Sequence, residues 1–268
     1  MNRHGNILTI LFPDIEIVNN NPIIPLLGLP YVGKTMTLIR LTRYLEEQGY
    51  RVEPDRFFRP SYDGYYSELC DTYQCMVNSA QAASSTSLVS ILMVNVYDKR
   101  GRSICSFIDT PGEMLRENSM ANKYLKYIQG TTNRKIWLFL LEPNMMDNTK
   151  LSSYKKCINE IIKNSNERDR NILLLNKSDL INNYFNLNNQ QQLYHFIGNR
   201  YPEILSSFDD HSFTSLLLRK LQIYTSPYIL SFQTGSFHES ESLGFIYQPS
   251  SNKNPKRLWE LILKIIKK

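Results

Sequence analysis

Long apolar runs are missing from this sequence. Its first apolar stretch, ILTILF at residues 7–12, is followed at once by Pro13 and Asp14. That length is too short for the hydrophobic part of a secretory signal or for a membrane-spanning helix. We therefore expect an ordinary soluble, cytoplasmic protein, and we expect no membrane contact.

Cysteine is also scarce, with four residues at positions 70, 75, 105 and 157. The spacing of Cys70 and Cys75 fits half of a metal site, but no second pair of Cys or His follows at ligand spacing. The expected role of the cysteines is therefore that of structural or surface thiols, which stay reduced in the cytosol.

The charge balance is only moderately basic, with 31 basic residues against 25 acidic ones and a net charge of +6. Because the sequence has no basic stripe away from its C-terminal end, we expect no nucleic-acid partner. The C-terminal lysines accompany an apolar stripe at helical spacing, which favours a final helix packed on the core over a helix on a membrane surface. The stripe consists of Leu258, Leu261, Ile262, Ile265 and Ile266.

Short apolar runs alternate with helical patterns along the chain. IIPLL at 23–27, KIWLFLL at 135–141 and NILLL at 171–175 are typical of buried parallel strands. Residues 87–112 predict two strands joined by a tight turn at Asp98–Gly101. The expected fold class is α/β, a mostly parallel sheet with helices on both faces and one antiparallel edge hairpin.

We expect one domain over residues 1–268, with two insertions. Residues 50–86 form a long irregular stretch with prolines, clustered tyrosines and a run of small residues, so it is either a functional, switch-region insertion or carries a helix of its own. Residues 181–212 form the second insertion, and its first part, rich in Asn and Gln, predicts a loop or a mobile helix edge over 181–192. The rest of the chain is predicted to hold a helix at 213–223, a strand at 226–232 and a polar loop at 233–254.

The eight residues GLPYVGKT, from Gly28 to Thr35, lie between the first predicted strand and a helical pattern. They match the phosphate-loop pattern G-x-x-x-x-G-K-[ST] at every specified position. Unpaired backbone N–H groups and the helix dipole converge at such a point, so the loop suits an anion. In the functional interpretation Lys34 contacts the β- and γ-phosphates and Thr35 binds Mg²⁺. The alternative is a plain turn before a helix.

A second motif, DTPG, lies at the end of the second hairpin strand. Asp109 at this strand end can hold Mg²⁺ through water, and Gly112 lets a backbone N–H approach the γ-phosphate because no Cβ is in the way. Alone, the segment would favour a surface turn built on Pro-Gly. After a matched phosphate loop it indicates a sensor for the γ-phosphate.

The third motif, NKSD, follows the strand at 171–175. A carboxylate at Asp179 offers two acceptor oxygens in one plane, which complement the N1–H and 2-amino group of guanine but not the edge of adenine. Lys177 is suited to lay its stem along the flat base. Asn176 is suited to brace the loop or to bond the base edge. Polar tetrapeptides after strands are common, so the specificity comes from three motifs in order, each at a strand end.

In this order the motifs resemble those of the P-loop GTPases of the translation-factor and Ras-like class. The resemblance covers residues 23–268 in motif order and is specific in the three quoted segments. It implies the fold of that family, binding of GTP and GDP with Mg²⁺, and a switch driven by the γ-phosphate. The residues that match by position are Gly28, Gly33, Lys34 and Thr35 in the phosphate loop, Asp109 and Gly112 in the second switch, and Asn176, Lys177 and Asp179 in the guanine motif.

The resemblance implies two further site residues. The first-switch threonine, which closes over Mg²⁺ in the family, has Thr86 as its nearest candidate, with Ser85 and Ser87 as competitors. The alternative is a surface run of Ser and Thr. The residue near the guanine carbonyl follows the last strand, which points to Ser231. The small residue and the lysine that usually come next are absent.

At position 113 the sequence departs from the Ras-like pattern. Ras-like members have a glutamine there that orients the attacking water, whereas this chain has Glu113. A carboxylate can accept a proton from water but lacks the amide donor. Hydrolysis is therefore expected to be slow, or to depend on another residue or on a cation from a partner. The alternative is that Glu113 faces solvent.

The sequence therefore predicts a cytosolic GTPase that hydrolyses GTP slowly and acts as a molecular switch with a protein effector or activating partner. Residues 50–86 are expected to change their order with the nucleotide state. One alternative is a GTP-binding interaction module with little or no hydrolysis. The other is an ATPase of the wider phosphate-loop class.

Overall fold

The computed structural model describes residues 15–79, 91–112, 122–145, 148–181, 189–208, 227–240 and 244–268. Its strands are β1 (Ile23–Leu27), β2 (Arg51–Pro54), β3 (Leu92–Tyr97), β4 (Ser103–Asp109), β5 (Ile136–Leu141), β6 (Arg170–Leu175), β7 (Tyr228–Ser231), β8 (Gly235–Ser240) and β9 (Gly244–Pro249). Its helices are α2 (Lys34–Glu47), α3 (Gly64–Asn78), α4 (Asn122–Gly130), α5 (Asn148–Lys163), the 3₁₀ turn η2 (Ser178–Leu180), α6 (Gln190–Arg200), α7 (Pro202–Ser206) and α9 (Lys253–Ile266).

The main sheet has seven strands in the order β2-β3-β4-β1-β5-β6-β7. Strand β1 pairs in parallel with β4 and β5, and the parallel pairing continues through β6 to β7. Strand β3 runs antiparallel to both β4 and β2. The predicted fold class is confirmed, and the hairpin predicted over 87–112 is β3–β4. The carboxyl ends of the parallel strands meet at one edge of the sheet, which is where open α/β sheets bind ligands.

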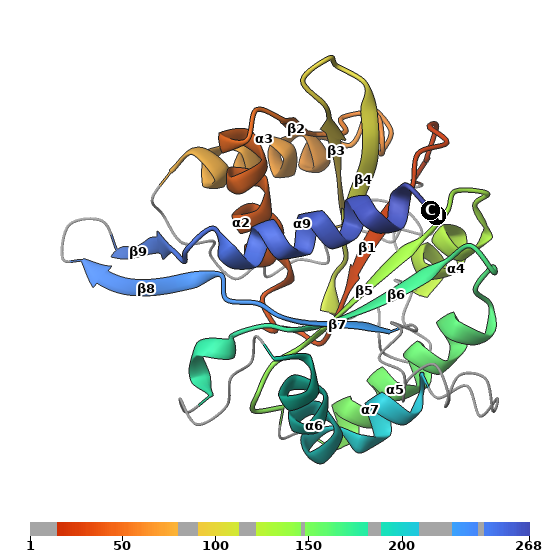
Figure 1. The fold of residues 1–268 in the computed structure, drawn as a ribbon. Coiled ribbons are helices and arrows are strands. Elements are labelled where there is room, and N and C mark those ends of the chain that lie inside the picture. The colour runs from red at the N-terminus through yellow and green to blue at the C-terminus, as the bar shows by residue number, and fades with distance from the viewer. Residues whose placement is uncertain are drawn as a thin grey trace, which may run out of the picture.

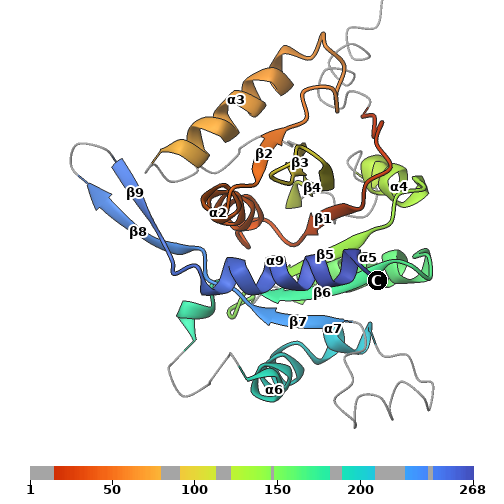
Figure 2. The same ribbon diagram turned by 45° about the horizontal axis from the view of Figure 1, so that its top comes forward.

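Helices cover both faces of this sheet (Figures 1 and 2), with α2 and α9 side by side on one face. The predicted final helix packs on the core, because Leu258, Trp259, Ile262 and Ile265 are buried. Trp259 meets the ring of Tyr50 edge-on at a centroid distance of 5.3 Å. The lysines of α9 are exposed to solvent. Core packing is therefore the correct interpretation of the C-terminal apolar stripe.

The described part of the stretch, residues 50–79, carries a strand and a helix. Strand β2 extends the sheet at its edge, and α3 packs on α2. The side chain of Asp63 caps α3 by accepting a hydrogen bond from the N–H of Tyr66, at 3.1 Å. Tyr66, Cys70, Tyr73 and Val77 are the buried residues of α3, and their spacing is that of one helix face. The alternative of a helix within this stretch is therefore correct, and irregular structure is wrong for 51–54 and 64–78.

One other loop prediction is wrong in part. Residues 235–240 and 244–249 of the polar segment 233–254 form the antiparallel pair β8–β9, which projects from the body of the protein (Figure 1). The sequence did not indicate these strands, because most of their described side chains face water and are polar. Tyr247 is buried. In the second insertion α6 begins at Gln190, capped by the Asn189 side chain, so the helix-edge alternative is correct for residues 190–192. The helix predicted at 213–223 lies outside the described residues.

The cysteine prediction agrees with the structure. All four cysteines are free thiols, and only Cys75 is exposed. Within the described ranges no group of three or more His, Cys, Asp or Glu side chains is placed to hold a metal ion. In that same part of the chain, every helix is too short or too polar to cross a membrane.

Candidate functional site

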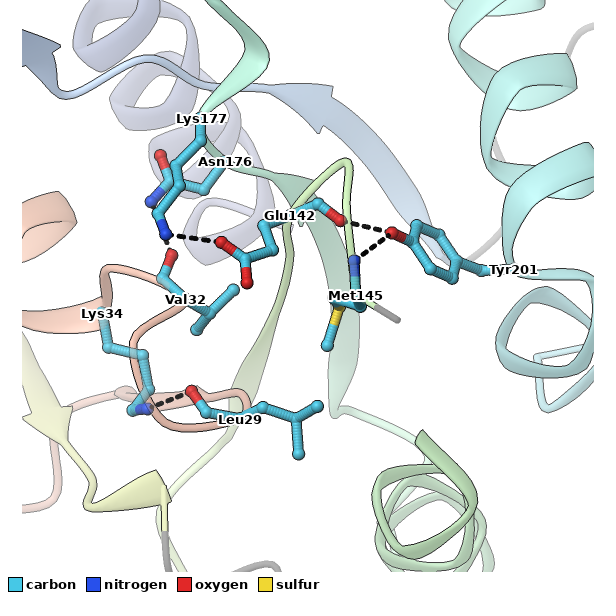
Figure 3. A network of polar contacts seen from close by, with 8 residues as sticks. All are labelled: Leu29, Val32, Lys34, Glu142, Met145, Asn176, Lys177 and Tyr201. Carbon is cyan, nitrogen blue, oxygen red and sulfur yellow. Dashed lines mark hydrogen bonds and ion pairs between the residues drawn. The ribbon is translucent and has the colours of Figure 1, made fainter. Parts of the chain in front are cut away.

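The loop between β1 and α2 closes around a lysine. Gly33 has a left-handed backbone (φ 89°) and lets the chain turn into α2, whose first N–H groups receive no side-chain cap. The Lys34 side chain is buried, and its ammonium donates hydrogen bonds to the carbonyl oxygens of Gly28 (2.9 Å) and Leu29 (3.0 Å). A positive charge at the centre of a loop and open N–H groups at a helix start together make an anion site. Lys34 and Leu29 are drawn in Figure 3.

Two of the predicted glycines lie where a side chain has no room. A Cβ on Gly33 would lie 2.5 Å from the amide nitrogen of Asn176, and a Cβ on Gly112 would lie 2.4 Å from the backbone nitrogen of Pro30. Gly28 is also crowded, by Val32 and by β5. Gly33 thus brings the phosphate loop against the NKSD motif, and Gly112 brings the DTPG motif against the phosphate loop. All three motifs therefore meet at the phosphate loop.

Two of the three predicted Mg²⁺ ligands, Thr35 and Asp109, are neighbours. The Thr35 hydroxyl donates a 2.6 Å hydrogen bond to Oδ2 of Asp109, which ends β4 opposite Leu26 of β1. Oδ1 of Asp109 is buried and has no hydrogen-bond partner in the described part of the chain. Burial raises the pKa of the Asp109 carboxyl, and the Thr35 hydrogen bond and the Lys34 charge oppose that rise in part. A hydroxyl and a carboxylate with one unsatisfied buried oxygen form a donor set that fits Mg²⁺.

This buried carboxylate makes folding stability depend on pH. Because its pKa is raised in the folded protein, stability falls as the pH rises through that value. We expect Asp109→Asn to be more stable than the natural protein at neutral pH. The difference should narrow below the ordinary aspartate pKa of about 4, where the wild-type carboxyl is neutral in both states. Urea unfolding of both proteins at several pH values measures this difference in the free energy of unfolding. A difference that stays constant with pH would contradict the raised pKa of Asp109.

The DTPG segment is anchored to the central strand. The Thr110 hydroxyl donates a hydrogen bond to the carbonyl oxygen of Leu26 in β1, and Gly112 is buried against Pro30. The backbone that would sense a γ-phosphate leaves β4 and is therefore tied to β1, the strand that leads into the phosphate loop. Thr86 and Glu113, the other predicted catalytic residues, lie outside the described residues.

The NKSD motif joins the phosphate loop through its first residue. Asn176 is fully buried and donates a 2.8 Å hydrogen bond from its amide to the carbonyl oxygen of Val32, as Figure 3 shows. Lys177 has a left-handed backbone (φ 50°), which turns the chain into η2. Asp179 lies in η2, and its side chain is exposed. Asn176 therefore braces the loop, and Asp179 is left free to face a ligand.

Ser231, predicted to follow the strand, is instead the last residue of β7. It pairs with Leu175 in the register of β6 and β7, and its side chain is buried. The next residue, Phe232, accepts a 3.2 Å hydrogen bond from the backbone N–H of Ser178. The segment after β7 is therefore tied to the NKSD motif.

The sequence interpretation missed two residues of this site, Glu142 and Tyr201. The Lys177 ammonium lies 2.5 Å from Oε2 of Glu142, which directly follows β5. The Tyr201 hydroxyl donates a hydrogen bond to the carbonyl oxygen of Glu142 and accepts one from the N–H of Met145 (Figure 3). Glu142 could have been found, because it is an acidic residue at the end of a strand beside β1. Tyr201 gave no local signal.

Comparison by sequence gives no relatives: no family model matches the chain, and neither does any curated protein sequence. Comparison by structure does. The chloroplast translocon components atToc33 and psToc159, which have GTPase activity, match over 92% of this chain and 83% of theirs, with 14% identity and a TM-score of 0.50. The chain has the G-domain fold of P-loop GTPases.

Two other solved structures resemble this G domain at lower TM-scores. Nucleolar GTP-binding protein 1 of Plasmodium falciparum has 13% identity and a TM-score of 0.44, with 95% of this chain and 90% of that chain covered. The signal recognition particle receptor complex SRb-GTP/SRX of Chaetomium thermophilum has 15% identity and a TM-score of 0.45, with coverage of 92% and 99%.

Proposed function

We propose that this G domain binds GTP and GDP with Mg²⁺, hydrolyses GTP to GDP and phosphate, and acts as a nucleotide-dependent molecular switch. The observation that carries the proposal is the convergence of three motifs on one loop. Lys34 lies inside that loop, Gly112 packs against it, and Asn176 bonds its carbonyl at Val32. A plain turn before a helix would not need these long-range contacts.

The phosphates would lie at the start of α2. The helix N-terminus and the Lys34 ammonium favour negative charge there, and they stabilise the charge that develops when water attacks the γ-phosphate in line. Thr35 and Asp109 would hold Mg²⁺, which supplies charge neutralisation to the β- and γ-phosphates when bound. The N–H of Gly112 is the proposed γ-phosphate sensor, because only glycine fits against Pro30.

The base would lie over Lys177 and face Asp179. The Asp179 carboxylate is exposed and lies in η2, directly after the left-handed residue Lys177. Guanine offers two donors to a carboxylate, whereas adenine offers an acceptor at N1. We therefore assign the base as guanine rather than adenine.

The base assignment predicts the effect of Asp179→Asn. An amide offers one acceptor and one donor, so GTP affinity should fall by about 10- to 100-fold, as expected for hydrogen bonds to a charged group. ATP affinity should stay unchanged. Calorimetric titration of the purified chain with GTP, GDP and ATP in Mg²⁺ measures both. Equal affinity of the natural protein for GTP and ATP would remove the guanine assignment and favour an ATPase.

Phosphate release at steady state separates the switch from its alternative. Turnover with GTP supports the GTPase proposal, including turnover that starts only after a partner protein is added. Tight GTP binding without turnover under either condition would support an interaction module that binds GTP as a structural ligand. This measurement decides between the two proposals because Glu113 replaces the glutamine that orients the attacking water in Ras-like members.

We further propose a cytoplasmic location and a protein effector or activating partner. Free thiols, including the exposed Cys75, agree with a reducing compartment. The partner is inferred from Glu113, because a chain that lacks the usual glutamine benefits from a cation supplied in trans. Nucleic acid and membrane surfaces are not part of the proposal.

A further inference from the structure

Lys177 is held in one place by a single side chain. Its side chain is 34% exposed, and its ammonium pairs with Glu142, whose side chain is 22% exposed. Partial burial reduces the screening that makes most surface ion pairs weak. Lys177 has a left-handed backbone, and its side chain has a long flexible aliphatic stem. The ion pair with Glu142 therefore decides where that stem lies.

Glu142 is itself held from the second insertion. Tyr201, between α6 and α7, is buried, and its hydroxyl bonds both the carbonyl oxygen of Glu142 and the N–H of Met145, the latter at 3.1 Å. Arg200 adds a 3.3 Å hydrogen bond to the carbonyl oxygen of Pro143. Figure 3 shows the resulting line from Tyr201 through Glu142 to Lys177, beside the phosphate loop at Val32. The backbone that carries the Glu142 carboxylate is therefore held by hydrogen bonds from Tyr201 and Arg200.

We propose that Glu142 is a positioning residue of the base subsite. Its carboxylate keeps the Lys177 ammonium at the β5 end, so that the aliphatic stem of Lys177 forms a wall for the flat face of the purine. Without that anchor, the ammonium would be drawn toward the polyphosphate, the strongest negative charge nearby, and the wall would be lost. The inference rests on the proposed nucleotide binding.

Glu142→Gln tests this role because it keeps the shape of the side chain and removes its charge. The dissociation constant for GTP should rise by about five- to tenfold. It should rise by the same factor for inosine triphosphate, which lacks the 2-amino group that Asp179 would bond. A merely structural change that displaced the whole NKSD loop would weaken GTP more than inosine triphosphate, since the Asp179 contact would be lost as well.

Two further variants make the test specific. In a Lys177→Ala background, Glu142→Gln should cause no additional loss, because Glu142 acts through Lys177. Glu203→Gln is the matched control: it removes the carboxylate from another Glu–Lys pair, with Lys155 at 3.7 Å on α5, and should leave GTP affinity unchanged.

The outcomes separate the two proposals. If the natural protein binds no guanine nucleotide, the proposed function fails and this inference fails with it. If the natural protein binds GTP and Glu142→Gln changes the dissociation constant by less than twofold, only this inference is overturned. An equal loss in the natural and Lys177→Ala backgrounds would also overturn it.

Discussion

Replacing Lys34 with methionine is expected to abolish measurable GTP turnover and to weaken GTP binding by about 100-fold. The ammonium lies inside the loop, against two carbonyl oxygens, so it is the group that a phosphate would meet. Hydrogen bonds to a charged group contribute about 1.5 to 3 kcal/mol each, and about 1.4 kcal/mol corresponds to a factor of ten in affinity. Phosphate release and calorimetric titration measure the two losses.

The chain provides a matched control at Lys135. This lysine is fully buried too, and its ammonium donates to the carbonyl oxygens of Gln129 and Thr131 at the other end of β5. Lys135→Met should lower thermal stability while leaving GTP affinity within twofold. If Lys34→Met also kept its affinity, the phosphates would have to bind somewhere other than this loop.

Replacing Gly33 with alanine is the second change with a large expected effect. Its left-handed backbone disfavours a Cβ by about 1 to 2 kcal/mol, and the new carbon would collide with the Asn176 amide. Overpacking adds about 1 to 3 kcal/mol. The thermal midpoint should fall by about 5 to 10 °C. GTP affinity should fall by more than about 30-fold, because the Asn176 brace is displaced.

Gly101→Ala separates the backbone effect from the collision. Gly101 is also left-handed (φ 76°), in the β3–β4 turn, but a Cβ there would meet nothing within 4 Å. This variant should lose only a few degrees of thermal midpoint, by about the cost of a left-handed alanine, and should bind GTP normally. Similar losses of GTP affinity in both variants would show that the contact between Gly33 and Asn176 is unimportant.

The sequence was sufficient for those parts of the fold in which a signal lies in consecutive residues. The apolar runs of β1, β5 and β6 and the pattern around Lys34 are local, and the structure places each where it was predicted. That the motifs meet at one sheet edge followed from parallel strand order alone.

The parts of the fold and of the site that the sequence did not predict depend on contacts between distant segments or lack an apolar pattern. Strand β2 gains its partner only through pairing with β3, some 40 residues later, and four residues alone carry no reliable strand signal. The β8–β9 hairpin buries little, so it lacks the apolar alternation that indicates a strand. Glu142 and Tyr201 join the base subsite through single side-chain contacts across 35 and 59 residues, which no periodicity records.

The docking of α3 has a consequence for how a partner could recognise this protein. Arg43 of α2 donates hydrogen bonds to the carbonyl oxygens of Met76 and Ser79, and Thr42 bonds the Tyr73 hydroxyl in the buried interface. These bonds join α3 to the helix that leaves the phosphate loop, not to a γ-phosphate sensor. We therefore expect the predicted change of order within residues 50–86 to leave α3 in place, so that a protein docked on the outer side of α3 would meet the same surface with GDP or GTP. Such an adaptor would recruit the G domain constitutively, and nucleotide-dependent recruitment would have to read other residues.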